Sequence, residues 1–104
     1  MIAMTHATYT VNEAYAEQNK LRIGRVIEEL RALRRTDIQY SVFTTDDGKT
    51  FIHMLLCTTE EAGKAFESLE AFADFQKGLG ASHPEVPPSV KSVNLVGSTS
   101  DFLS

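Results

Sequence analysis

The spacing of apolar residues along the chain predicts four strands and two helices. Short runs rich in β-branched and aromatic residues, which favour strands, occupy 2–11, 37–45, 49–57 and 90–96. Apolar residues spaced three and four apart predict a helix from about residue 13 to residue 35 and a second over residues 58–79. The resulting βαββαβ order is that of the ferredoxin-like fold. We therefore expect an α+β protein with a four-stranded antiparallel sheet and both helices on one face.

The segment 46–49, Asp-Asp-Gly-Lys, predicts a hairpin between the second and third strands. An Asp-Gly pair suits a two-residue type I′ turn, which places Asp47 and Gly48 at the turn centre. Counting back from that turn fixes the pairing of the two strands. The predicted pairs are Val42 with His53, Tyr40 with Leu55 and Ile38 with Cys57.

The third strand, Phe-Ile-His-Met-Leu-Leu-Cys at 51–57, is apolar on both faces. Side chains alternate along a strand, and a strand with one wet face should alternate apolar with polar residues. Two helices cover only one face of a small sheet. We therefore expect the open face to be buried against a second copy of the chain, which makes the protein a homodimer.

Length and charge exclude several classes of protein. A chain of 104 residues is expected to form one domain over residues 1–104. The net charge of −4 argues against a nucleic-acid partner, which requires a basic surface. No run approaches the roughly 20 apolar residues of a membrane span, and the first residues lack the features of an export signal. We expect a cytoplasmic protein that does not associate with membranes.

His53 is the leading candidate for chemistry. An imidazole on a buried strand is costly unless its nitrogens are hydrogen-bonded, and histidine titrates near neutral pH. Tyr40, a diagonal neighbour on the same face, is close enough to bind the oxygen of a ligand or to act with His53. These two residues are the predicted catalytic pair. The alternative is structural, with His53 bonded to its neighbours and Tyr40 filling the core.

Four further residues are predicted to bind a ligand. His6 lies on the first strand, which neighbours the third strand in this topology, although the sequence leaves their relative register open. Asn19 lies one helical turn before Ile23 and so can point inward. The aromatic stripe of the second helix contributes the other two, Phe72 and Phe75.

The sequence predicts neither a metal site nor a cofactor. His53 and Cys57 share a face but lie roughly 13 Å apart along the strand, too far to bind one ion. The chain has no Cys-x-x-Cys or His-x-x-x-His motif and no glycine-rich phosphate loop.

In its element order and in three segments the chain resembles the dimeric α+β-barrel superfamily, and within it antibiotic biosynthesis monooxygenase-like proteins. The segments are Asp-Gly-Lys-Thr-Phe-Ile-His-Met at 47–54, Leu-Glu-Ala-Phe-Ala-Asp-Phe-Gln-Lys-Gly-Leu at 69–79, and Leu-Val-Gly at 95–97. The resemblance implies two sheets packed across a dimer and an apolar pocket between each sheet and its helices. It also implies oxidation of aromatic polyketides or quinols by oxygen without a cofactor.

Two alternatives remain open within this resemblance. The chain has no tryptophan, so the Asn/Trp/His arrangement of the haem-degrading branch is incomplete. Stress-responsive barrels and related polyketide cyclases carry histidines on strands 3 and 1, which His53 and His6 would match, and this implies a non-oxidative enzyme. A non-catalytic ligand-binding or structural dimer is the other alternative. The space beside His53 discriminates, because an enzyme needs it unfilled by Phe66, Phe72, Phe75 and Met54.

Overall fold

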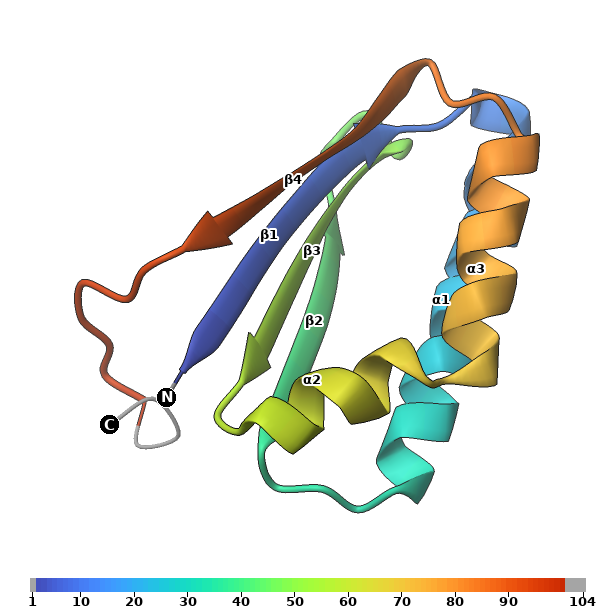
Figure 1. Cartoon of the computed structure of the whole chain (residues 1–104). Coiled ribbons are helices and arrows are strands. Elements are labelled where there is room, and N and C mark those ends of the chain that lie inside the picture. Colours follow the sequence, from blue (N-terminus) through green and yellow to red (C-terminus); the bar gives the residue numbers. More distant parts are fainter. Residues whose placement is uncertain (1, 101–104) are drawn as a thin grey trace.

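The computed structural model describes residues 2–100 and contains one antiparallel sheet and a helical layer (Figure 1). The strands are β1 (Ala3–Thr10), β2 (Ile38–Thr44), β3 (Thr50–Cys57) and β4 (Val86–Val93). The helices are α1 (Ala16–Ala32), α2 (Glu60–Glu67) and α3 (Glu70–Ala81), and a short 3-10 turn, η1 (Glu13–Tyr15), precedes α1. Within the described range, no helix combines the length and the apolar character needed to cross a membrane.

The strand order β2-β3-β1-β4 places β3 and β1 in the middle of the sheet. Figure 1 shows α1, α2 and α3 on the same side of this sheet, so the opposite face carries no helix. This arrangement confirms the predicted ferredoxin-like α+β fold. It also leaves β4, which follows α3 in the chain, as one edge of the sheet.

The register of the β2–β3 hairpin is the predicted one, although the turn is not. Val42 pairs with His53 and Tyr40 with Leu55, as the sequence indicates. A type I′ turn needs a positive φ at both central residues, but in this turn only Gly48 has one, at 73°. The chain instead forms a four-residue loop, in which the Gly48 amide donates to the Thr45 carbonyl oxygen. Both loops give the strands the same pairing.

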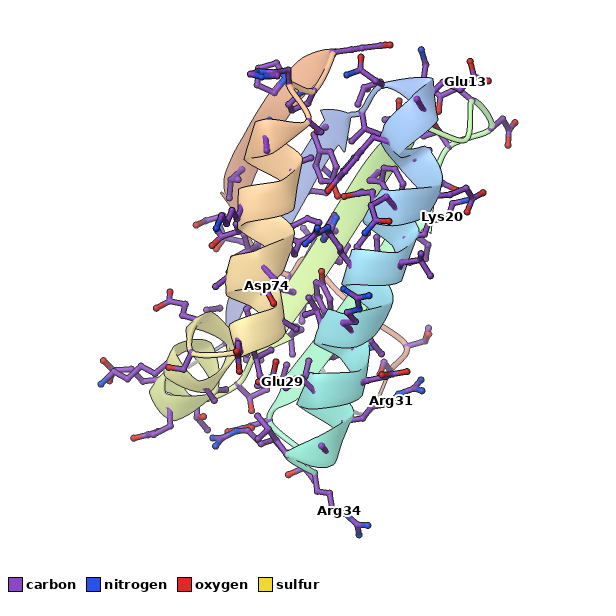
Figure 2. The ribbon with its side chains drawn as sticks, turned by 90° about the vertical axis from the view of Figure 1, so that its right-hand side faces the viewer. Glu13, Lys20, Glu29, Arg31, Arg34 and Asp74 are labelled. Carbon is purple, nitrogen blue, oxygen red and sulfur yellow. The ribbon has the colours of Figure 1, made fainter. Side chains whose placement is uncertain are left out.

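The prediction of one helix over residues 58–79 is wrong, because the structure divides this segment into two helices. Leu69 adopts an extended conformation with ψ of 128°, which separates α2 from α3. The carboxylate of Glu29, on α1, accepts hydrogen bonds from the amides of Glu70 and Ala71 at 3.2 and 2.8 Å. It therefore caps the start of α3 from another helix. Figure 2 shows Glu29 between α1 and the beginning of α3. The apolar spacing continues through the break and does not reveal it.

The last strand begins earlier than predicted. β4 starts at Val86 and includes Pro87 and Pro88, which lie before the predicted start at residue 90. Proline is tolerated on an edge strand, because its missing amide is not needed for pairing on both sides. The pairing with β1 shifts between Thr8 and Thr10, and this irregularity accommodates the two prolines.

The core lies between the sheet and the helices. It is mainly apolar and aromatic, and its buried hydrophobic cluster comprises Tyr9, Val11, Ala16, Ile23, Val26, Phe51, Phe66, Leu69, Phe75 and Leu79. Among the described residues two polar side chains are buried, Asn19 and His53. Burial of a polar group is costly without hydrogen bonds. We therefore expect both side chains to have hydrogen-bond partners inside the protein.

Candidate functional site

His53 faces the helices from the middle of β3. Its neighbours across the sheet are Ala7 on β1 and Val42 on β2, and its side chain is 7% exposed. The sequence left open whether this residue belongs to the helical side or to the open face. The structure places it on the helical side.

Both ring nitrogens of His53 have a tyrosine hydroxyl as partner. Tyr9 Oη lies 2.7 Å from Nε2, and Tyr40 Oη lies 2.7 Å from Nδ1. Asn19 Nδ2 donates a third hydrogen bond, of 2.9 Å, to Tyr9 Oη. The chain of groups therefore runs Asn19–Tyr9–His53–Tyr40 and draws one residue each from α1, β1, β3 and β2.

The donors and acceptors in this hydrogen-bonded series constrain where its protons lie. A neutral imidazole has one donor and one acceptor nitrogen. Because the oxygen of Tyr9 already accepts from Asn19, its own hydrogen is free to point at Nε2. Nδ1 then carries the proton and donates to Tyr40, whose hydroxyl hydrogen is left to point elsewhere. The Tyr40 hydroxyl, at one end of this series, can therefore donate a hydrogen bond to a further group.

Burial keeps His53, Tyr9 and Tyr40 uncharged at neutral pH. Burial lowers the pKa of His53 from 6.5 to about 4. It raises the pKa of the Tyr9 hydroxyl well above its ordinary value of 10, against a smaller opposing effect of the Asn19 hydrogen bond. Burial likewise raises the pKa of Tyr40. The group is therefore a neutral hydrogen-bonded relay at pH 7.

A cavity of about 710 Å³ lies beside this relay, and Tyr9, Tyr40 and His53 form part of its wall. Its remaining lining is mostly apolar, and comes from the sheet, from α2 and α3, and from the segment that follows α3. These residues are Thr5, Ala7, Leu55, Phe66, Glu67, Phe72, Phe75, Gln76, Leu79, Gly80, Pro84, Pro88 and Val90. The volume falls in the range of small-molecule sites, roughly 300–1,000 Å³.

Four of the predicted site residues come together here. Tyr40 and His53 are in hydrogen-bond contact, as their predicted register suggested, and Phe72 and Phe75 line the same cavity. The ring centroids of His53 and Phe75 are 5.4 Å apart. Met54, which would have helped to fill this space, is adjacent to His53 on the strand and so points to the other face.

Two predicted ligand-binding residues do not line the cavity. His6 pairs with Met54, whereas Ala7 pairs with His53, so His6 lies on the opposite face of the sheet. The register that the sequence left open therefore places the two histidines on opposite faces of the sheet. Asn19 does point inward, but it is fully buried behind Tyr9 and contacts that hydroxyl rather than the cavity.

Sequence reasoning missed Tyr9, which completes the site. Its place opposite Phe51 depends on the pairing of β1 with β3, a contact between segments about forty residues apart that no local turn determines. One signal was available, because Tyr9 and Val11 alternate with polar threonines at the end of the strand. A buried hydroxyl at such a position needs a polar partner.

Comparison with solved structures shows a known fold. No family profile and no curated protein sequence matches the chain. An antibiotic biosynthesis monooxygenase structure superposes with a TM-score of 0.72 at 14% identity, covering 93% of this chain and 100% of that one. The cofactor-independent oxygenase SnoaB from Streptomyces nogalater gives 0.71 at 11%, covering 94% and 96%. A protein from Pseudomonas aeruginosa gives 0.74 at 16%, covering 92% and 95%. At these identities the likeness shows the fold alone.

The depressed pKa of His53 predicts an acid-sensitive stability. In the unfolded chain this histidine takes up a proton below about pH 6.5, whereas in the folded protein it does so only below about pH 4. The unfolded state therefore binds more protons between these values, and stability falls as the pH falls from 6.5 to 4. Between pH 7 and pH 5 we expect a loss of about 2 kcal/mol in the free energy of unfolding, measured by urea denaturation.

The His53→Gln variant should lack most of this loss, whatever its stability at pH 7. The His6→Gln variant, altered on the opposite face, should retain it. An equal pH dependence in the wild-type protein and the His53→Gln variant would contradict the assignment.

Proposed function

Since the chain has the fold of antibiotic biosynthesis monooxygenases, we propose that it binds a small aromatic or quinol-type molecule and oxidises it with oxygen, without a cofactor. The observation that carries this proposal is the neutral relay of His53 and its two tyrosines in the wall of an aromatic cavity. Such a cavity, largely apolar with a few convergent polar groups, is the usual form of a small-molecule site.

The aromatic side chains suit a flat ligand. Phe66 and Phe72 have ring centroids 4.7 Å apart, and Phe72 and Phe75 stack nearly parallel at 6.2 Å. Aromatic rings prefer offset-stacked or edge-to-face contacts with one another. A planar ligand between these rings and the sheet places one of its oxygens within reach of Tyr40.

The relay supports proton movement in either direction. When Asn19 donates to Tyr9, each group donates to the next one toward the cavity, and Tyr40 donates to a ligand oxygen. Rotation of the Asn19 amide reverses the order of donors, because its Oδ1, buried and without a partner among the described residues, then accepts from Tyr9. Tyr40 then donates to His53 Nδ1 and accepts from a ligand hydroxyl. Asn19 is in this account a positioning residue.

In the inward arrangement the ligand becomes an anion. Its hydroxyl proton moves to Tyr40 as the Tyr40 proton moves to His53, and the imidazolium forms beside the ligand's negative charge. The electron-rich anion forms a C–O bond with oxygen, and the resulting peroxide takes back the proton from His53 through Tyr40. The hydroperoxide then loses water, so a ring methylene and O₂ become a ring carbonyl and one water molecule, and no external reductant is required.

A binding protein without catalysis is the second candidate. It is favoured by one observation, that both nitrogens of His53 already have partners within the protein. In that case the relay only holds the wall of the cavity in place.

The Tyr40→Phe variant separates these functions. We use anthrone, whose enol form carries the required hydroxyl and whose oxidation gives anthraquinone and water. Oxygen consumption and anthraquinone absorbance should show catalysis by the wild-type protein and a loss of about 100-fold in kcat for Tyr40→Phe, the usual scale for removing an acid–base group.

Tyr15→Phe is the matched control, because the Tyr15 hydroxyl lies outside the cavity lining and has no hydrogen-bond partner within residues 2–100. It should retain wild-type turnover. Full turnover in Tyr40→Phe would contradict the mechanism, and binding of anthrone without oxygen uptake by the wild type would favour the binding protein.

We also propose that the open face of the sheet forms a homodimer. Ile52 and Met54 of β3 are half-buried on this face and Phe43, paired with Ile52, is 55% exposed, whereas Leu56 on the same face is already buried within the chain. A contiguous apolar surface of this kind usually marks an interface. His6 lies on the same face, beside Met54.

Light scattering should give twice the chain mass of 11.5 kDa at micromolar concentration. Met54→Lys, at the centre of the open face, should shift the protein to a monomer. Leu21→Lys, on the outer side of α1 and 61% exposed, should leave the dimer intact. A wild-type monomer would rule out the interface.

A further inference from the structure

The described residues that line the cavity include a negatively charged side chain and no positively charged one. Glu67, at the end of α2, is the one charged residue among the described residues that line it, and neither lysine nor arginine is among them. The histidine in the wall is neutral. A ligand therefore meets a carboxylate at the rim and no cation.

Other local groups add to this polarity. Leu79 and Gly80, from the last turn of α3, also line the cavity, and the C-terminal end of a helix carries partial negative charge. The faces of aromatic rings are negative as well.

Two arginines and a lysine of the elements around the cavity have other partners or lie on the other face. Arg22 donates to the Asp74 carbonyl oxygen on the far side of α3, and Arg35 forms a two-fold ion pair with Asp37. Lys91 pairs with His6 in the sheet, so its side chain lies on the open face. None of these cations compensates a negative ligand inside the cavity.

We infer that the cavity selects an uncharged aromatic ligand and rejects a carboxylated one, and that Glu67 is the residue that determines this specificity. The inference rests on the proposed function only for the aromatic class of the ligand. Tyr40 and Glu67 line the same cavity. We therefore expect a carboxylate on the outer ring of a tricyclic ligand that reaches Tyr40 to come within a Debye length, about 10 Å at 0.1 M salt, of Glu67.

The test compares hydroxyanthraquinone with anthraquinone carboxylate at pH 7, by equilibrium dialysis. At low salt the carboxylate should bind about tenfold more weakly to the wild-type protein, as expected for two like charges near a protein surface. Raising the salt to 1 M should narrow this difference, because a charge at the rim is screened.

Glu67→Gln should reduce the difference in affinity between the two compounds to within about twofold, mainly because the carboxylated compound binds more tightly. Glu28→Gln is the matched control: it changes the net charge equally, but Glu28 is exposed on α1 and does not line the cavity. It should preserve the tenfold difference.

Equal or tighter binding of the carboxylate by the wild type would overturn the inference. So would a difference that persists in Glu67→Gln. If neither compound binds, the proposed aromatic site is wrong, and the inference fails with it. If the selectivity is found but anthrone oxidation is not, only the oxygenase proposal is overturned and the inference is supported.

Discussion

An imidazole buried on the central strand of the sheet requires a hydrogen-bond partner for each nitrogen, and much of the structure follows from that requirement. The partners of His53 come from both neighbouring strands, as Tyr9 from β1 and Tyr40 from β2. Each tyrosine reaches its nitrogen only in the observed pairing, since a shift of one residue turns its side chain to the other face. Asn19 then ties α1 to the same group through Tyr9. The polar relay thus links three strands and a helix within an apolar core.

The helical layer leaves space beside this relay instead of filling it. The chain turns at Leu69, and Glu29 holds the start of α3 from the neighbouring helix. Phe66 lies before this turn and Phe75 after it, and both rings line the cavity. In an uninterrupted helix Phe66 and Phe75, nine residues apart, would point in opposite directions, because nine residues make two and a half turns. The break therefore has a functional consequence, because it lets both rings face the same cavity.

The predictable features were those set by local chemistry. The placement of Tyr40 and His53 on one face followed from the Asp-Gly turn and from the two-residue period of the strands. The features that were missed depend on distant segments. The pairing of β1 with β3 places Tyr9 at the site and His6 on the other face, and the carboxylate that separates α2 from α3 comes from α1. Hydrophobic periodicity contains no information about either contact.

Imidazole ¹⁵N NMR of the wild-type protein can show whether His53 is held neutral between two tyrosine hydroxyls. We expect one protonated and one unprotonated nitrogen in His53 from pH 8 down to pH 5, with protonation of the second nitrogen only near pH 4. Removal of the Tyr9 hydroxyl, in Tyr9→Phe, should shift the Nε2 resonance most, because that nitrogen loses its partner. A His53 titration midpoint near 6.5 would contradict the account, because it would mean that the imidazole is solvated and not part of a buried relay.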